Sequence, residues 1–472
     1  MKKTAILLLF LLCSCSVNPA MKKPSVPKAH AYAARDELVS MNSKIVLGNR
    51  IASDWWALFS SKPLNDLIRL AIGNNYDLAA ARETLKAAEA AANAERAALL
   101  PRVSLDAAAG RQKYGAALFG PANFSIPPFN YYEIGPSISW TPDIFGRAHH
   151  AVEFRKALAD YQVHQLDAAY LFLTGNTVAQ TLEMAAACDE IKTARRILSE
   201  DEKTLELTKE AHEIGSASEK GVLRAQARLT SDRSMLPPIE HRLSASRHAL
   251  AILLGKMPAN WHPPGIGLGD FTMPKALSLS LPSELARRRP DILAAEANLN
   301  AARATIGAAN ANLYPSLTLT ANMMQEALTP AGIFSSAGTA WALAAGISAP
   351  VFDGGRLSAE KEEAGHAYRA ALARYRQTIL NAFGEVADAL TSLAHDEEAV
   401  ETAKSSVETA GNTLNLALLS YRAGSVGQLQ VHDAWRTLEI MRLDLLRLEH
   451  LRYLDCVRLF VALGGSPLSG KA

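Results

Sequence analysis

The sequence predicts a mainly helical chain that also carries four membrane-length β-strands and consists of two copies of one helix–strand–strand–helix–helix unit. Three observations support this prediction. The composition is rich in Ala and Leu and poor in aromatic residues, which is typical of long packed helices. Landmark residues recur at a nearly constant interval along the chain. Four short segments alternate strictly between apolar and polar residues, as strands with one apolar face do.

Length, charge and motifs narrow the classes of function. The chain has 472 residues, enough for one large elongated unit or for several ordinary domains. Its 49 Lys and Arg nearly balance its 47 Asp and Glu, so no strong positive field favours a nucleic-acid partner. The four Cys residues have no metal-ligand spacing, and no nucleotide loop, Gly-x-Ser-x-Gly elbow or His-Glu-x-x-His motif is present. We therefore expect no enzyme activity, no metal and no bound cofactor.

The N-terminus resembles a bacterial lipoprotein signal peptide. Two Lys residues precede an apolar run that is too short to cross a membrane as a helix. Ser14 places a small residue directly before Cys15, so we predict that residues 1–14 are the signal peptide and that Cys15 receives a covalent lipid. Residues 15–50 would then be a lipidated linker. An ordinary secretory signal with incidental Cys residues is the alternative. After the leader no run of about 18 apolar residues follows, so a membrane-spanning part must consist of strands.

The duplication divides the mature chain into two repeats, 51–255 and 283–465. A Pro-rich bridge at 256–282, predicted to be irregular, joins them, and residues 466–472 form a tail. The interval between matched residues becomes slightly shorter between the two strands of a repeat, as a shorter connecting loop in the second copy would produce. The matched pairs are Asp77 and Asp291, Pro101 and Pro315, Gly146 and Gly355, and Gly215 and Gly424.

Each repeat is expected to begin with a helix, roughly 64–100 or 283–313, that ends at a proline. After the strands, a very long helix runs from Gly146 to near Gly215, or from Gly355 to near Gly424, and a return helix follows. The long helix would span roughly 100 Å and the leading helix about half of that. A leading helix and a return helix must therefore stack end to end beside one long helix. A heptad seam is predicted at Leu372, Ile379, Val386 and Leu393, with Tyr375, Ala382 and Ala389.

The strands are predicted at about 102–112, 131–141, 315–326 and 341–351, each long enough to cross a bilayer when tilted. Tyr132, Trp140 and Trp341 lie near strand ends, where an aromatic belt is expected. Four strands cannot close a barrel, and an open edge is not tolerated in hydrocarbon. The barrel must therefore be shared: two chains would give a filled barrel and three a channel. A soluble four-stranded sheet packed on helices is the alternative.

Several motifs resemble the bacterial outer membrane factors, the TolC-like efflux and secretion ducts. The motifs are "ISWTPDIFGR", "RRRPDILAAEANLNAARATIGAANANLYPSL", "APVFDGGRL" and "YRAGSVGQLQV". The lipoprotein branch associated with resistance-nodulation-division (RND) pumps, the NodT type, fits best. The resemblance implies a homotrimer with a 12-stranded β-barrel, four strands per chain, in the outer membrane. A long α-helical barrel would extend from it into the periplasm. It also implies an adaptor protein and an inner-membrane RND-type transporter as partners.

The implied function is passive export of small molecules through the outer membrane channel of a tripartite efflux system. The duct of a type I protein secretion system is one alternative, and a periplasmic coiled-coil scaffold without a pore is another. By the resemblance, Asp433 lines the constricted periplasmic aperture, with Gln430 beside it and Arg224, its counterpart in the first copy, as a partner across the mouth. The same resemblance assigns the adaptor-docking tips to Gly215, Val222, Gly424 and Val431.

Overall fold

The computed structural model describes residues 32, 45–47, 54–115, 127–274, 277–279 and 282–464. With those gaps, they form two compact units. One contains Leu85–Gln162 and Ala295–Tyr375, and the other contains residues 54–84, Val163–Ala294 and residues 376–464. The predicted signal peptide, the lipid acceptor Cys15, most of the linker and the tail at 466–472 lie outside the described residues. Within the described part, no helix is both long and apolar enough to cross a membrane.

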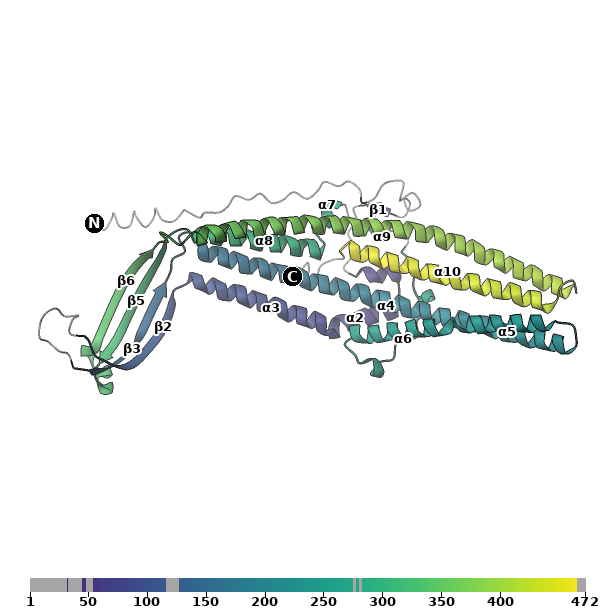
Figure 1. Cartoon of the computed structure of the whole chain (residues 1–472), viewed down its shortest axis with the longest axis horizontal. Coiled ribbons are helices and arrows are strands. Elements are labelled where there is room, and N and C mark those ends of the chain that lie inside the picture. The colour runs from purple at the N-terminus through teal and green to yellow at the C-terminus, as the bar shows by residue number, and fades with distance from the viewer. Residues whose placement is uncertain are drawn as a thin grey trace. The chain divides into compact units, whose positions relative to one another are not determined.

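The first unit contains a four-stranded antiparallel sheet with the strand order β2-β3-β5-β6 (Figure 1). Its strands lie within a few residues of the four predicted segments. The last strand ends shortly before Pro350, since proline lacks the N–H group that a strand ladder requires. The strands are β2 (Arg102–Gln112), β3 (Phe129–Trp140), β5 (Ser316–Ala327) and β6 (Thr339–Ser348).

Strand register gives this sheet one continuous apolar face. Val103 lies opposite Ile138, and Ile138 lies opposite Ala321. Ala321 in turn lies opposite Leu343. Directly paired residues project to the same side of a sheet, so all four strands present their apolar residues together. The single chain leaves this face uncovered, because Val103 is 67% and Leu343 75% exposed.

Each repeat contains one helix of 67 residues, α4 (Arg147–Glu213) or α9 (Arg356–Arg422). Both helices begin directly after a glycine with positive φ, 86° at Gly146 and 88° at Gly355. A residue with a Cβ is strained in this conformation, so glycine permits the sharp change of direction from strand to helix. The predicted seam of α9 is buried, with exposed fractions of 2% or less at Tyr375, Ile379, Ala382, Val386 and Leu393.

The leading helix of each repeat is interrupted, which corrects the expectation of one continuous helix over 64–100 and over 283–313. In the first repeat Asn75 is extended, with ψ 125°, and its Oδ1 accepts a hydrogen bond from Leu78 N at 2.9 Å. This contact caps the next helix. In the second repeat Pro290 disfavours a helical conformation at the residue before it. The helices are α2 (Lys62–Asn74), α3 (Tyr76–Arg96), α7 (Pro282–Leu285) and α8 (Pro290–Ala311).

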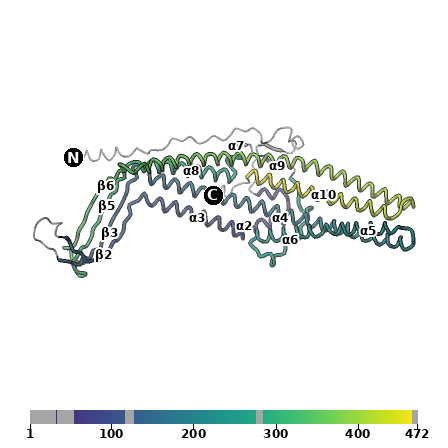
Figure 2. Tube along the Cα trace, in the orientation of Figure 1, coloured from purple at the N-terminus to yellow at the C-terminus, as the bar shows by residue number. Residues whose placement is uncertain are grey.

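The return helices differ between the repeats. In the second repeat α10 (Gln428–Ala462) is continuous, whereas the first repeat has α5 (Glu219–Arg233) followed by α6 (Leu236–Leu253). Pro237 and Pro238 lie in the first turn of α6, where a missing N–H removes no helical hydrogen bond. A helix that continued through them would lose such bonds, so the helix restarts there. The trace shows α10 beside α9 (Figure 2).

In both repeats the return helix meets the interruption of the leading helix. Asn75 Nδ2 donates to the carbonyl of Leu253 at 3.1 Å, and Arg289 Nη1 donates to the carbonyl of Ala462 at 2.8 Å. Asn75 and Arg289 are equivalent positions of the duplication, as are Leu253 and Ala462. Each side chain satisfies a carbonyl at a helix C-terminus, where no intrahelical donor remains. The expected end-to-end stacking of return and leading helices is therefore present.

The core of the second unit gathers around aromatic residues that precede α2. Trp55 stacks on Phe460 of α10 with a centroid distance of 5.3 Å, and Phe59 meets Phe460 edge-on at 6.3 Å. The bridge between the repeats joins this core, since Tyr453 Oη donates to the carbonyl of Phe271 at 3.0 Å. The bridge is more ordered than the sequence predicts. It contains β4 (Leu277–Leu279), which pairs in parallel with β1 (Ile45–Leu47).

Replacing Arg289 with alanine should lower the stability of the chain. Arg289 is 7% exposed, and its guanidinium donates to Asp291 at 2.7 and 3.0 Å, to Glu385 at 2.6 Å and to the carbonyl of Ala462. Charge-assisted hydrogen bonds of this kind contribute about 1–3 kcal/mol, so Arg289→Ala should lower the denaturant midpoint measured by circular dichroism in detergent. Arg287→Ala is the control, because Arg287 is exposed. Equal midpoints for the two variants would contradict this role of Arg289.

Candidate functional site at the ends of the helical hairpins

Both long helices reverse through glycine turns of the same geometry. Gly215, between α4 and α5, has φ 79°, and Gly424, between α9 and α10, has φ 73°. This is the left-handed conformation, which glycine adopts without the strain that a Cβ would cause. In each turn the N–H after the glycine bonds to a carbonyl at the helix end, as when Ser216 donates to Ala211 at 2.7 Å. Among the described residues, no atom beyond the adjoining backbone would lie within 4 Å of a Cβ at either glycine, so the turn itself selects glycine.

The two valines predicted at these ends are not the most exposed apolar residues there. Val222 is half-buried and packs with Leu198 and Leu205 of α4. Val431 is also half-buried. No local pattern in the sequence marks the outward-facing residues, because the direction of a helical side chain depends on the phase of its helix against its neighbour. The most exposed large apolar residues near the turns are Ile214 (81%), Leu223 (62%), Leu416 (65%) and Leu419 (60%).

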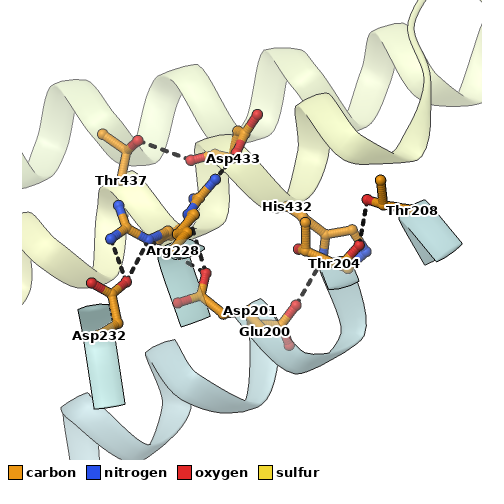
Figure 3. A network of polar contacts seen from close by, with 10 residues as sticks. Glu200, Asp201, Thr204, Thr208, Arg228, Asp232, His432, Asp433 and Thr437 are labelled. Carbon is orange, nitrogen blue, oxygen red and sulfur yellow. Dashed lines mark hydrogen bonds and ion pairs between the residues drawn. The ribbon is translucent and has the colours of Figure 1, made fainter. Parts of the chain in front are cut away.

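Asp433 of α10 belongs to a polar network that connects three helices (Figure 3). Its Oδ1 accepts a hydrogen bond from Arg228 Nη1 of α5 at 2.6 Å, and its side chain is 60% exposed. Arg228 Nε also lies 3.2 Å from Asp201 Oδ1 of α4. Within the chain, the partner of Asp433 is thus Arg228. Arg224 lies one helical turn earlier on α5 and is exposed, and its contact with Asp433 across the mouth stays a prediction. Gln430 lies one turn before Asp433 and is exposed as well.

A second arginine, Arg436 of α10, contacts the two buried carboxyl groups of this network. Its Nε lies 3.0 Å from Asp232 Oδ2 of α5 and 3.4 Å from Asp201 Oδ1. Asp201 is 2% exposed and Asp232 7%. Burial raises the pKa of Asp201 to about 7, the neighbouring Asp232 carboxylate adds to this rise, and Arg436 and Arg228 oppose it. Among the described residues, Oδ2 of Asp201 has no hydrogen-bond partner.

His432 makes another link between α10 and α4. Its Nδ1 lies 2.8 Å from Glu200 Oε2, and Lys203 Nζ donates to the other oxygen of Glu200 at 2.7 Å. Burial acts to raise the pKa of Glu200, but the hydrogen bonds and charges of Lys203 and His432 outweigh it, so the pKa lies below its ordinary value. Glu200 is therefore a carboxylate at neutral pH.

This site joins three helices through ion pairs. Carboxylates from α4, α5 and α10 share two arginines, so each ion pair crosses from one helix to another. Within the described ranges, no group of three or more His, Cys, Asp or Glu side chains could hold a metal ion. Of the three aspartates in the network, only Asp433 is largely exposed, and it is therefore the one able to act on an ion outside the protein.

The sheet of the first unit provides a second kind of site, because its two outer strands each have one edge without a partner strand among the described residues. Among the described strands, β2 and β6 each pair on one side only. The predicted aromatic belt is divided between the strand ends: Tyr132 is near the start of β3 and Trp341 near the start of β6, whereas Trp140 ends β3. Trp341 is 72% exposed, and Trp140 Nε1 donates to the carbonyl of Leu99 at 3.1 Å. Whether these residues meet a lipid headgroup layer stays a prediction.

A membrane-length sheet with open edges, joined to two long helical hairpins, defines a channel subunit that combines strands with helices. A profile of the outer membrane efflux protein family matches residues 67–256 and 281–465, which cover most of each repeat. The chain therefore belongs to the outer membrane efflux protein family. The predicted resemblance is thereby confirmed.

Individual proteins agree with this assignment. The toluene efflux pump outer membrane protein TtgF of Pseudomonas putida is 31% identical over 98% of this chain and 96% of its own length. The probable outer membrane lipoprotein SilC of Salmonella typhimurium is 28% identical over 98% of each chain. The solved structure of the outer-membrane channel OprN has a TM-score of 0.86 and 29% identity, covering 96% of this chain and 99% of that one.

The family match and the similarity to the proteins above establish three expectations drawn from the sequence, namely the fold, the location and the function. The fold is mainly helical with transmembrane strands, and the protein is located in the outer membrane. It functions as an outer membrane efflux channel, in preference to a protein-secretion duct or a coiled-coil scaffold.

Proposed function

We propose that three copies of this chain form one passive exit duct, with twelve strands closed into a barrel and the long helices forming a periplasmic tunnel. The observation that carries this proposal is the pair of open sheet edges on β2 and β6 within the described residues. An unpaired backbone N–H or C=O in hydrocarbon costs several kcal/mol, so each edge must pair with a strand of another copy.

The two faces of the sheet support three copies in preference to two. A barrel of about eight strands fills with side chains, whereas more strands leave room for a channel. One face is apolar and suits lipid, since Val103 and Leu343 lie exposed on it. The opposite face is lined on its last strand by small residues that would leave the interior open, namely Ala340, Ala342, Ala344 and Gly346.

Asp433 is the residue that we assign to the periplasmic aperture, with Gln430 one turn before it. Three symmetry-related copies would place three exposed carboxylates around one opening, which attracts cations. Arg228 holds each of them against the α4–α5 hairpin. Arg224 is exposed on the same helix and remains available for a contact with a neighbouring copy. The aperture therefore combines a fixed charge with an ion pair that must break when α10 moves away from α5.

The duct requires partners for direction and energy. We propose that a periplasmic adaptor docks on the helix turns at Gly215 and Gly424, and that an inner-membrane RND-type transporter supplies small molecules. The exposed Ile214, Leu223, Leu416 and Leu419 support this, since apolar side chains that gather on an exposed end mark a contact surface. The half-buried Val222 and Val431 would support the turns from within. The name of TtgF, a toluene efflux pump protein, favours small apolar cargo for this chain too.

A lipid on Cys15 would add a second attachment to the outer membrane. The small residue before Cys15 supports this, and so does the name of SilC, a probable outer membrane lipoprotein. The lipid would hold the N-terminal segment at the membrane independently of the strands.

Trimer formation is measurable by mass. In detergent, light scattering combined with refractive index should give a protein mass about three times the 50.7 kDa of one chain, because only several copies can pair every strand edge. A protein that remains a monomer while its strands are folded would contradict the shared barrel.

Replacing Asp433 with alanine should raise single-channel conductance in planar bilayers, or lower the preference for cations. The substitution removes the exposed carboxylate and also breaks the ion pair with Arg228. Asp444→Ala is the matched control, since Asp444 is an exposed carboxylate further along α10. If the two variants conduct alike, Asp433 does not line the aperture.

Replacing Cys15 with serine should abolish incorporation of radiolabelled palmitate while the trimer still assembles. The hydroxyl group cannot take the place of the thiol in lipidation, whereas strand pairing does not involve this residue. Cys188→Ser, in the second unit, serves as the control. Undiminished labelling of Cys15→Ser would show that another residue carries the lipid.

A further inference from the structure

We propose that Asp201 makes closure of the duct entrance depend on pH: its protonated form keeps α10 against the α4–α5 hairpin, and its ionised form loosens α10. The inference rests on the proposed role of the hairpin ends as the entrance, and it assigns a regulation to that site. The acting group is the carboxylate–arginine cluster, which we define as Asp201, Arg228, Asp232 and Arg436 (Figure 3).

Geometry places Asp201 where three helices meet. It comes from α4 and is 2% exposed. From α5, Arg228 approaches it within 3.2 Å and Asp232 lies beside it. From α10, Arg436 approaches within 3.4 Å. The residue before Asp201 on α4, Glu200, contacts α10 as well, through His432.

Charge counting shows why the proton matters. With Asp201 neutral, the two arginines have one carboxylate each: Arg228 pairs with Asp433, and Arg436 pairs with Asp232. With Asp201 ionised, three carboxylates share two arginines, and the excess negative charge is buried. Its Oδ2 atom has no hydrogen-bond donor among the described residues, so nothing there compensates for lost water. The ionised cluster is therefore stabilised by any movement that admits water.

The direction in which pH affects the packing of α10 follows from the cause of the raised pKa of Asp201. Burial, the largest cause, raises the pKa of Asp201 from 3.8 to about 7 in the packed arrangement. When α10 moves away and water enters, burial no longer acts, and the pKa falls toward its ordinary value. The packed arrangement thus binds the proton more tightly. Protonation therefore lowers the free energy of the packed arrangement relative to the loosened one. This stabilisation is largest at acidic pH, declines as pH rises, and is lost above about pH 7.

The contact between His432 and Glu200 gives α10 a second polar link to α4. The pKa of Glu200 is lowered by Lys203 and His432, so Glu200 stays ionised across the range in which Asp201 titrates. The link to Glu200 therefore stays in place while the charge of Asp201 changes.

A second buried acid pair provides an internal control. Asp396 of α9 lies beside Asp455 of α10, and burial followed by the Asp455 charge raises its pKa to about 7 as well. Arg452 and Arg458, which lower that pKa, also belong to α10, so this pair connects only the two helices of one hairpin. Ionisation of Asp396 should leave the contact between the two hairpins unchanged.

The test uses the full-length trimer in planar bilayers between about pH 5.5 and pH 8, where Asp201 changes charge. For the wild type, we expect the ratio of open to closed events to rise with pH, by up to about tenfold per unit for each subunit that moves, and to level off above about pH 7. Asp201→Asn, which is neutral at every pH, should keep the channel predominantly closed and flatten this rise.

Two further variants separate the cluster from general effects on folding. Asp232→Asn should move the midpoint of the rise to lower pH, because it removes the like charge beside Asp201 and leaves Arg436 for it. Asp396→Asn should reproduce the wild-type profile.

The possible failures are distinct. A wild type that conducts with no pH dependence, or an Asp201→Asn variant that retains the full rise, would overturn the role of Asp201. If Asp232→Asn leaves the midpoint of the pH-dependent rise unchanged, the role of Asp201 is overturned as well. A trimer that forms no channel at any pH would instead contradict the proposed duct.

Discussion

Backbone hydrogen bonding in hydrocarbon is the constraint on which the rest of this molecule depends. Four strands per chain leave the edges of β2 and β6 open within the described residues, and a lipid bilayer offers no water to satisfy them. Assembly is therefore part of folding for this sheet, not an addition to a finished subunit. The exposed apolar face has the same cause, because a side chain such as Leu343 gains nothing from a core of its own chain when lipid will cover it.

The duplication accounts for the shared arrangement of helices and strands, and the two copies differ at the hairpin ends, where we propose the entrance. At the helix junctions both copies use the same device, a side chain at Asn75 or Arg289 that satisfies the last carbonyls of the return helix. At the hairpin ends the copies differ. The positions equivalent to Asp201, Arg228 and Asp232 in the second copy hold Ala410, Thr437 and Met441. One hairpin therefore supplies three residues of the cluster and the other supplies Arg436, with Asp433 paired to Arg228 beside it.

Local signals could be predicted from the sequence, and contacts between distant segments could not. Strict alternation located the strands, and glycines located the turns of the long helices. Pro290 is a local signal for one interruption of the leading helices, but the hydrogen bonds of Asn75 and Arg289 to carbonyls more than 170 residues away appear in no local pattern. The duplication aligned Asp433 with Arg224, but equivalent positions need not touch, and the phase of α5 brings Arg228 into reach instead. Asp201 was missed because its neighbours in "SEDEK" are typical of a solvated surface, and only packing buries it.

The second unit holds its helices together with two kinds of contact, an apolar seam on α9 and buried ion pairs around Asp201. Ile379, Val386 and Leu393 form an apolar seam, and such a seam keeps its strength whatever the pH. A duct entrance sealed in this way would open only against the full loss of buried apolar area. Buried ion pairs are different, because desolvation offsets much of their attraction and the balance can be reversed by one proton. In the proposed entrance, the buried ion pairs of Asp201 would allow α10 to move, whereas the apolar seam of α9 would hold its helices together at every pH.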